Sequence, residues 1–421
     1  MRLNKTLPGF LLLLLALPAY PAARLTYQLN GVPVPVSWQN GAFPLRVEID
    51  RRIVSQKPEA ETVIARAFAE WTAIGDASLS FAPTSVVDGL KPGKDGQNSI
   101  SMADDLFRDQ HFLAVTTNWY DDSGHMTESD IQIDGGTLAG SCDLQALFAH
   151  EVGHMLGLDH SGVLSSVMYP YVGKVGVPSL DSDEAIAIAE IYPHSSRGDA
   201  GATLQGRVVG DGGGIFAAQV VALNEKGEPV ATALTDQQGS FSIDGLPSGT
   251  YRLYAEPLDG PVDVQNLSGI WRNAKVQSFP TQFADGGAIH VESGKVYGNV
   301  VVNASGVVQL NPRWIGASTP GGGDVSLAAA PVIVRPGQTV SLAIGGDGFT
   351  SGMTTFEIPN PSFHRLSDFA YASNYVSATY SIDSDIAPGS AVVLVKSGNE
   401  SAALTGALRV AGRPRVRAAR K

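Results

Sequence analysis

The most informative part of the sequence is His150-Glu151-Val152-Gly153-His154-Met155-Leu156-Gly157-Leu158-Asp159-His160. Residues 144–156 predict a helix, on which His150 and His154 stand four residues apart, so that both imidazoles can reach one ion. Gly157 can take the left-handed conformation that ends a helix. The chain then turns back, which allows His160 to approach the same ion.

This spacing predicts a catalytic zinc site rather than a structural one. Three neutral imidazoles leave one of the four positions around zinc open for water. Glu151 adjoins the first histidine without ligating the ion, and is placed to take a proton from water and pass it to a leaving amine. We therefore predict one Zn²⁺ ion held by His150, His154 and His160, and hydrolysis of peptide bonds. The ligands alone leave hydrolysis of a non-peptide substrate open.

On these residues the sequence resembles the metzincin metallopeptidases, and within them the matrixins. The zinc motif continues as Leu158-Asp159-His160-Ser161, and Val167-Met168-Tyr169-Pro170 is similar to the Met-turn of this group. Further likeness lies in Ala67-Phe68-Ala69-Glu70-Trp71 with Leu79-Ser80-Phe81, and more weakly in Asp181-Ser182-Asp183-Glu184 with Ile191-Tyr192. The likeness covers about residues 42–193.

The resemblance implies an α+β metzincin domain with a twisted mixed sheet and an active-site helix. It places Met168 beneath the zinc ligands. It also implies an edge strand that pairs with an extended substrate peptide, and a pocket for the side chain that follows the scissile bond. The residues so implied are Leu113, Ala114 and Val115 for the strand, and Pro170, Tyr171 and Val172 for the pocket. Val172 stands where the family usually has a tyrosine.

The sequence also departs from the animal members of this family. No propeptide with a zinc-blocking cysteine is found between the predicted signal peptide and residue 42. The run Ile131-Gln132-Ile133 stands where a histidine ligand of a second zinc ion would be expected. Asp130 and Asp134 could hold Ca²⁺, although acidic residues at a strand edge are more often simply solvated. We therefore expect one zinc ion and leave calcium open.

Beyond the zinc motif the sequence predicts two all-β sandwich domains, because short alternating strands follow one another between Gly-rich turns. Residues 206–255 resemble the carboxypeptidase regulatory-like domain through Thr235-Asp236-Gln237-Gln238-Gly239-Ser240-Phe241 and Gly249-Thr250-Tyr251-Arg252-Leu253. The last unit is similar to immunoglobulin-like domains. The expected division is a signal peptide at 1–23, the matrixin-like domain at 24–196, a linker at 197–203, sandwiches at 204–305 and 306–412, and a basic tail at 413–421.

The start of the chain and its composition indicate export. Arg2 and Lys5 precede a short leucine-rich run and Ala22-Ala23, which is typical of a cleaved signal peptide, with an uncleaved anchor as the alternative. No later run reaches about 18 apolar residues, so no transmembrane anchor is expected. The net charge of −12 argues against a nucleic-acid partner, and the single Cys142 excludes an intrachain disulfide. We expect a secreted, extracellular or periplasmic protein.

Two functions from different classes follow. The first is a secreted zinc-dependent endopeptidase with a protein or peptide substrate. The alternative is an exported surface-binding or adhesion protein, in which the sandwiches bind a surface or polymer and the metal site is vestigial. The intact motif favours the enzyme, and the simpler role for the sandwiches is that of spacers, because a fold resemblance alone does not establish function.

Overall fold

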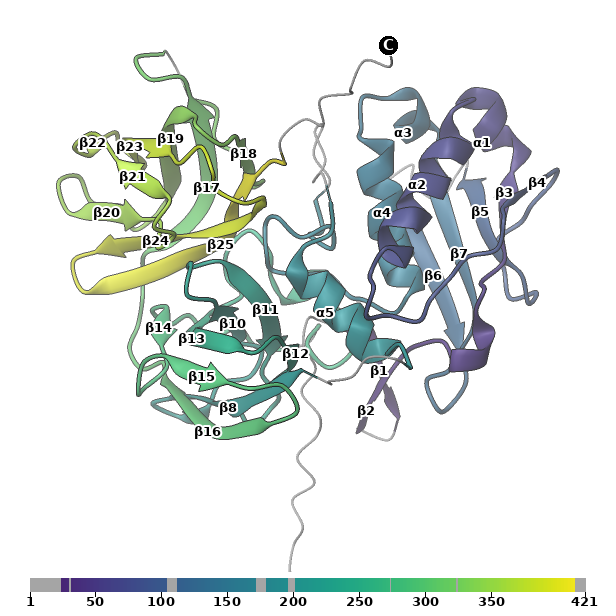
Figure 1. The fold of residues 1–421 in the computed structure, drawn as a ribbon, viewed down its shortest axis with the longest axis horizontal. Helices are drawn as coiled ribbons and strands as arrows, with labels where there is room; N and C mark the ends of the chain where they lie inside the picture. The colour runs from purple at the N-terminus through teal and green to yellow at the C-terminus, as the bar shows by residue number, and fades with distance from the viewer. Residues whose placement is uncertain are drawn as a thin grey trace, which may run out of the picture.

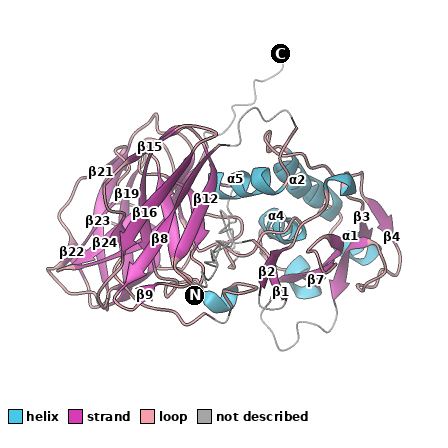
Figure 2. Ribbon diagram, turned by 90° about the horizontal axis from the view of Figure 1, so that it is seen from below, coloured by secondary structure: helices cyan, strands magenta, loops and turns pink. Residues whose placement is uncertain are grey.

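The computed structural model describes residues 24–29, 32–103, 112–171, 179–195, 201–272, 274–322 and 325–412. Figure 1 shows an α+β N-terminal part followed by two β-sandwiches, and Figure 2 shows the helices gathered at one end of the molecule. This is the predicted fold class. The predicted signal peptide, most of the predicted linker, Val172 and the basic tail lie outside the described residues.

A five-stranded sheet forms the centre of the N-terminal part, in the order β4-β3-β5-β7-β6. The first four of these strands run parallel, whereas β6 is antiparallel to β7 and ends the sheet. Within the described residues the outer side of β6 pairs with no other strand, so it can accept an added one. The strands are β3 (Val47–Asp50), β4 (Ser85–Val87), β5 (Asn98–Ala103), β6 (Ala114–Tyr120) and β7 (Met126–Asp134), preceded by a hairpin of β1 (Thr26–Leu29) and β2 (Val32–Pro35) and by the short helix η1 (Asn40–Ala42).

The long helices α2 and α4 pack on each other through an apolar face. Trp71 of α2 donates its indole N–H to the carbonyl of Ala149 on α4 at 2.9 Å, and both Trp71 and Phe148 are fully buried. Apolar residues recur at helical spacing over 59–74, which predicts a helix there. This helix and the one predicted over 144–156 are confirmed within two residues at each end. The helices are α1 (Arg51–Gln56), α2 (Ala60–Thr72), α3 (Gly135–Ala139), α4 (Leu144–Met155) and α5 (Ser182–Ile191).

Two sheets form each of the sandwiches. The middle sandwich joins the sheet β11-β10-β13-β14, with β15 on β13, to the sheet β12-β8-β16, with β9 on β8. Its elements are β8 (Ala202–Gly210), β9 (Gly213–Gly214), β10 (Gln219–Leu223), β11 (Pro229–Leu234), β12 (Ser240–Leu246), β13 (Gly249–Glu256), η2 (Val264–Asn266), β14 (Gln282–Phe283), β15 (Ile289–Val291) and β16 (Val296–Asn303).

The C-terminal sandwich joins the sheet β17-β19-β23-β21, with β22 on β23, to the sheet β18-β25-β24-β20. One apolar cluster between the two sheets forms its core. Its strands are β17 (Asn311–Ser318), β18 (Val332–Val334), β19 (Thr339–Asp347), β20 (Thr354–Glu357), β21 (Phe363–Arg365), β22 (Ala370–Tyr371), β23 (Tyr375–Ile382), β24 (Gly389–Ser397) and β25 (Glu400–Val410).

Helix α5 joins the three parts and lies between them in Figure 1. Its Asp183 carboxylate accepts hydrogen bonds from the backbone N–H of Thr232 on β11 at 2.7 Å and from the Thr232 hydroxyl at 3.0 Å. Asp181, which caps α5, forms an ion pair with Arg409 of β25 at 2.9 Å. Both sandwiches are therefore packed against the N-terminal part instead of hanging from a free tether. Within the described residues no helix is long and apolar enough to span a bilayer.

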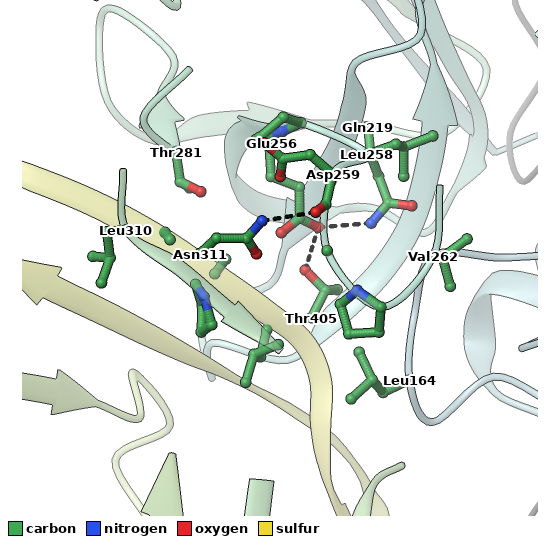
Figure 3. Close-up of a pocket in the computed structure, with 18 of the residues that line it drawn as sticks. Leu164, Gln219, Glu256, Leu258, Asp259, Val262, Thr281, Leu310, Asn311 and Thr405 are labelled. Atoms are coloured by element: carbon green, nitrogen blue, oxygen red, sulfur yellow. Dashed lines mark hydrogen bonds between the residues drawn. The ribbon is translucent and has the colours of Figure 1, made fainter. Parts of the chain in front are cut away.

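A cavity of about 40 Å³ opens where the three parts meet, and Figure 3 shows its lining. Leu164 comes from the N-terminal part, Glu256 and Asp259 from the middle sandwich, and Asn311 and Thr405 from the C-terminal one. The carboxylate of Glu256 accepts hydrogen bonds from Gln219 at 2.6 Å and from the Thr405 hydroxyl at 2.5 Å. The cavity has room for about two or three water molecules.

Glu256 makes the stability of this junction depend on pH. Burial raises its pKa to about 7 from an ordinary value of 4.5, so the folded protein holds the proton more tightly than the unfolded chain. The free energy of unfolding therefore falls as pH rises from about 4.5 to about 7, by up to about 3 kcal/mol at 1.36 kcal/mol per pKa unit. Glu256→Gln removes this loss, and its thermal midpoint should exceed that of the wild type at pH 8 but not at pH 4.5. The exposed Glu357→Gln is the matched control, and a Glu256→Gln difference that stays constant across this range would contradict the prediction.

Candidate metal centre

Helix α4 and the turn after it place three histidines around one point. Asp143 caps the start of α4 by accepting hydrogen bonds from two backbone N–H groups, and His150 and His154 lie one turn apart on the helix. Gly157 has a φ of +95°, and a Cβ there would lie 2.5 Å from the carbonyl oxygen of Val36. A glycine is therefore needed both for the conformation and for the space, and this turn returns the chain so that His160 faces the helix.

The three imidazoles lie close enough together to hold one metal ion. One ligand nitrogen from each of His150, His154 and His160 lies within 4.8 Å of the other two. The ring centroids are 4.7 to 5.2 Å apart, and the Nε2 atoms of His150 and His154 are separated by 3.1 Å. Within the described residues no other group of three His, Cys, Asp or Glu side chains meets this description.

The outer nitrogens show which tautomers are present. The Nδ1 atoms of His150 and His154 face the carbonyl oxygens of Val167 and Leu158, each at 2.8 Å. A carbonyl can only accept, so each Nδ1 carries a proton and each Nε2 offers a lone pair. Two lone pairs 3.1 Å apart repel each other unless a cation lies between them. The donor set therefore fits a zinc ion, with neutral imidazole ligands.

Burial keeps His150 and His154 neutral. It lowers the pKa of His150 to about 3, and neighbouring His160 acts in the same direction. The pKa of His154 is also well below its usual value, first because of burial and then because of the two other histidines. At neutral pH both rings are unprotonated at Nε2 and can act as ligands.

Glu151 lies beside the ligands and is tied to the edge strand. Its carboxylate accepts a hydrogen bond of 2.5 Å from the hydroxyl of Thr116 on β6. Burial raises the pKa of Glu151 to about 7, while the hydrogen bond from Thr116 acts in the opposite direction. Asn118, also on β6, donates to the carbonyl of His154 at 3.1 Å. The side chains of one strand therefore fix both the candidate base and the ligand helix.

Met168 lies against the ligand helix at the position between its two histidines. A Cβ on Gly153 would come within 2.2 Å of the Met168 sulfur, so only glycine leaves room for this contact. Met168 is 1% exposed, and its backbone N–H donates to the Ser166 hydroxyl at 2.9 Å. Glu184 of α5 in turn accepts from Ser166 at 2.5 Å, which holds the turn in place.

The residues implied for substrate binding lie at the start of β6 and shortly after Met168. Leu113 precedes β6, and Ala114 and Val115 begin it. Pro170 and Tyr171 come after Tyr169, the residue that follows Met168. The ring of Tyr171 is 5.6 Å from that of Tyr169 and its side chain is exposed, whereas Val172 lies outside the described residues.

The two candidate calcium ligands have partners within the protein. Asp130 accepts hydrogen bonds from Gly93 and from the backbone and hydroxyl of Ser99, and Asp134 caps α3 through Thr137. These bonds give both carboxylates a structural role. That they bind Ca²⁺ stays a prediction.

Sequence reasoning missed the contacts that reach the metal centre from outside the motif. The family resemblance implies an edge strand over 113–116, which contains Thr116, but the contact of the Thr116 hydroxyl with Glu151 has no signal in the sequence. The backbone carbonyl of Asn266 lies 2.5 Å from Nδ1 of His160, although 106 residues separate them. No local pattern could predict that contact.

Comparison with known proteins agrees with this geometry. The family model of the matrixins matches residues 37–193. Residues 37–193 form a matrixin domain. Residues 203–260 match the carboxypeptidase regulatory-like domain, which corresponds to the first strands of the middle sandwich. Residues 37–193 include His150, Glu151, His154 and His160.

The curated relatives resemble short parts of the chain. Karilysin of Tannerella forsythia is 45% identical over 50 residues, which are 12% of this chain and 10% of karilysin. The hatching enzyme of Paracentrotus lividus is 35% identical over 32% of this chain and 22% of its own length. Metalloendoproteinase 2-MMP of Arabidopsis thaliana is 30% identical over 32% of this chain and 37% of its own. The chain thus spans well under half the length of each of these relatives.

Proposed function

We propose that the protein is an exported zinc-dependent endopeptidase. One observation carries this proposal: the Nε2 sides of His150 and His154 converge with His160 on one point, beside a buried Glu151 that does not belong to this group of three. The general chemistry of such a site is peptide hydrolysis, in which bound zinc acidifies water and polarises a carbonyl.

The residues of this chain have separate roles in that reaction. Glu151 accepts a proton from water as a new bond to the peptide carbonyl forms, and then delivers that proton to the amine that leaves. Thr116 holds the Glu151 carboxylate in place through its 2.5 Å hydrogen bond. An extended substrate pairs its backbone with the open edge of β6, and the pocket for the following side chain lies near Pro170 and Tyr171.

Removing the metal with a chelator and then adding Zn²⁺ back tests the proposal. The purified full chain should clear denatured casein, lose this activity on dialysis against a chelator, and regain it when one equivalent of Zn²⁺ is returned. Glu151→Gln protein purified in the same way controls for a contaminating protease. A folded, zinc-loaded wild type that leaves casein intact would reject the peptidase and favour the surface-binding alternative.

A further inference from the structure

The third histidine ligand is oriented from a different domain than the first two. The Nδ1–H groups of His150 and His154 donate hydrogen bonds to the carbonyls of Val167 and Leu158, which belong to the matrixin domain. The Nδ1 of His160 instead donates at 2.5 Å to the carbonyl of Asn266, which belongs to η2 of the middle sandwich. The hydrogen bond that sets the tautomer and ring angle of His160 therefore comes from the accessory domain.

A second set of contacts ties the backbone of His160 to the same place. One oxygen of the buried Asp159 carboxylate accepts from the His160 N–H at 2.8 Å. The other oxygen accepts from both the backbone N–H and the hydroxyl of Ser268, each at 2.6 Å. Residues 263–268, here called the docking segment, thus hold the ligand by its ring and by its main chain.

The docking segment is itself rigidly anchored. Asp263 and Asn266 form a reciprocal capping box around η2. Val264, Leu267 and Trp271 are buried in a cluster with Leu234 of β11, and the Trp271 indole donates to the carbonyl of Thr235 at 3.1 Å. The carbonyl of Asn266 is therefore fixed to the sandwich core and can hold His160 at a defined angle.

We propose that the docking segment is part of the metal centre, with Ser268 as a positioning residue for the third zinc ligand. This inference rests on the proposed function only for the identity of the metal. Partners that orient metal ligands typically account for 10- to 100-fold of metal affinity. The accessory domain thus contributes to zinc binding without providing a ligand.

The test compares zinc affinity in full-length variants. Ser268→Ala keeps the backbone N–H but removes one of the two bonds to Asp159, and it should weaken zinc binding about tenfold in competition with a chromogenic chelator. Ser268→Thr keeps the hydroxyl and should restore the affinity. Ser278→Ala is the matched control, because the Ser278 hydroxyl donates a similar hydrogen bond to the Asp259 carboxylate at 2.5 Å. Neither residue is hydrogen-bonded to a ligand histidine or to Asp159. The zinc affinity of Ser278→Ala should equal that of the wild type.

A spectroscopic readout separates positioning from loss of fold. The cobalt-loaded Ser268→Ala protein should show an altered visible absorption spectrum, while its thermal midpoint stays close to that of Ser278→Ala. Wild-type affinity and an unchanged cobalt spectrum in folded Ser268→Ala would overturn the inference. Zinc binding without casein cleavage would reject the proposed peptidase instead, and the affinity comparison would still decide the role of the docking segment.

Discussion

Replacing Glu151 with glutamine is expected to lower kcat about 10³-fold while one zinc ion per chain is retained. Glutamine has nearly the shape of glutamate and can still accept the hydrogen bond from Thr116, so the local geometry is kept. It cannot accept a proton from water, which removes the general base. The measurement is kcat on a quenched fluorescent peptide, together with the zinc content of the same sample.

A matched control for this variant is Glu70→Gln. Glu70 lies on α2, outside the metal centre, and is hydrogen-bonded by Gln145 of α4. Its replacement should leave turnover unchanged. If Glu151→Gln retained more than about a tenth of the wild-type kcat, water would have to be activated by another group, and general base catalysis by Glu151 would be wrong.

Replacing Arg409 with methionine is expected to destabilise the protein by about 3–5 kcal/mol. Arg409 is 5% exposed, and its guanidinium lies 2.9 Å from the Asp181 carboxylate at the junction of α5 and β25. It also donates to Ser390 at 3.0 Å and to Ser179 at 2.8 Å. Methionine fills much of the space but leaves the Asp181 charge buried without its counter-ion, which is the costly outcome. Urea unfolding monitored by tryptophan fluorescence measures the change.

The comparison is with an exposed pair of the same chemistry. Arg51 and Asp88 lie 2.7 Å apart on the surface, and Arg51→Met should cost at most about 1 kcal/mol. The double variant Asp181→Asn with Arg409→Met should recover part of the lost stability, because no unpaired buried charge remains. Equal losses in Arg409→Met and Arg51→Met would show that the buried pair does not hold the C-terminal sandwich to α5.

The parts of the fold that the sequence predicts are those with a local period. The apolar spacing around Trp71 and Phe148 identifies α2 and α4, and the four-residue step from His150 to His154 places two rings on one face. The short helices α1 and α3 carry one or two buried side chains each, too few to show a period. They form because Asp50 and Asp134 cap them at the ends of β3 and β7.

In the candidate site, too, the sequence predicts the residues that share a helix but not the contacts that depend on packing. His150, Glu151 and His154 can be predicted because one helix carries them. The contacts of Glu151 with Thr116 and of His160 with Asn266 depend on how β6 and η2 pack, and packing across 35 or 106 residues leaves no periodic trace in the sequence. The association of the sandwiches with α5 also depends on contacts between distant residues, because Asp183 contacts Thr232 and Asp181 contacts Arg409 only in the folded chain.

The junction at α5 bears on how such a chain can be assembled by recombination. A breakpoint between Ser195 and Ala202 would separate Asp183 from Thr232 and Asp181 from Arg409, so both carboxylates would lose the partners that the sandwiches provide. It would also part His160 from Asn266. A newly acquired downstream domain would have to restore all three contacts at once. Recombination would therefore have to transfer the three parts of the chain together. The matrixin domain of this protein is poorly suited to being joined to other downstream domains.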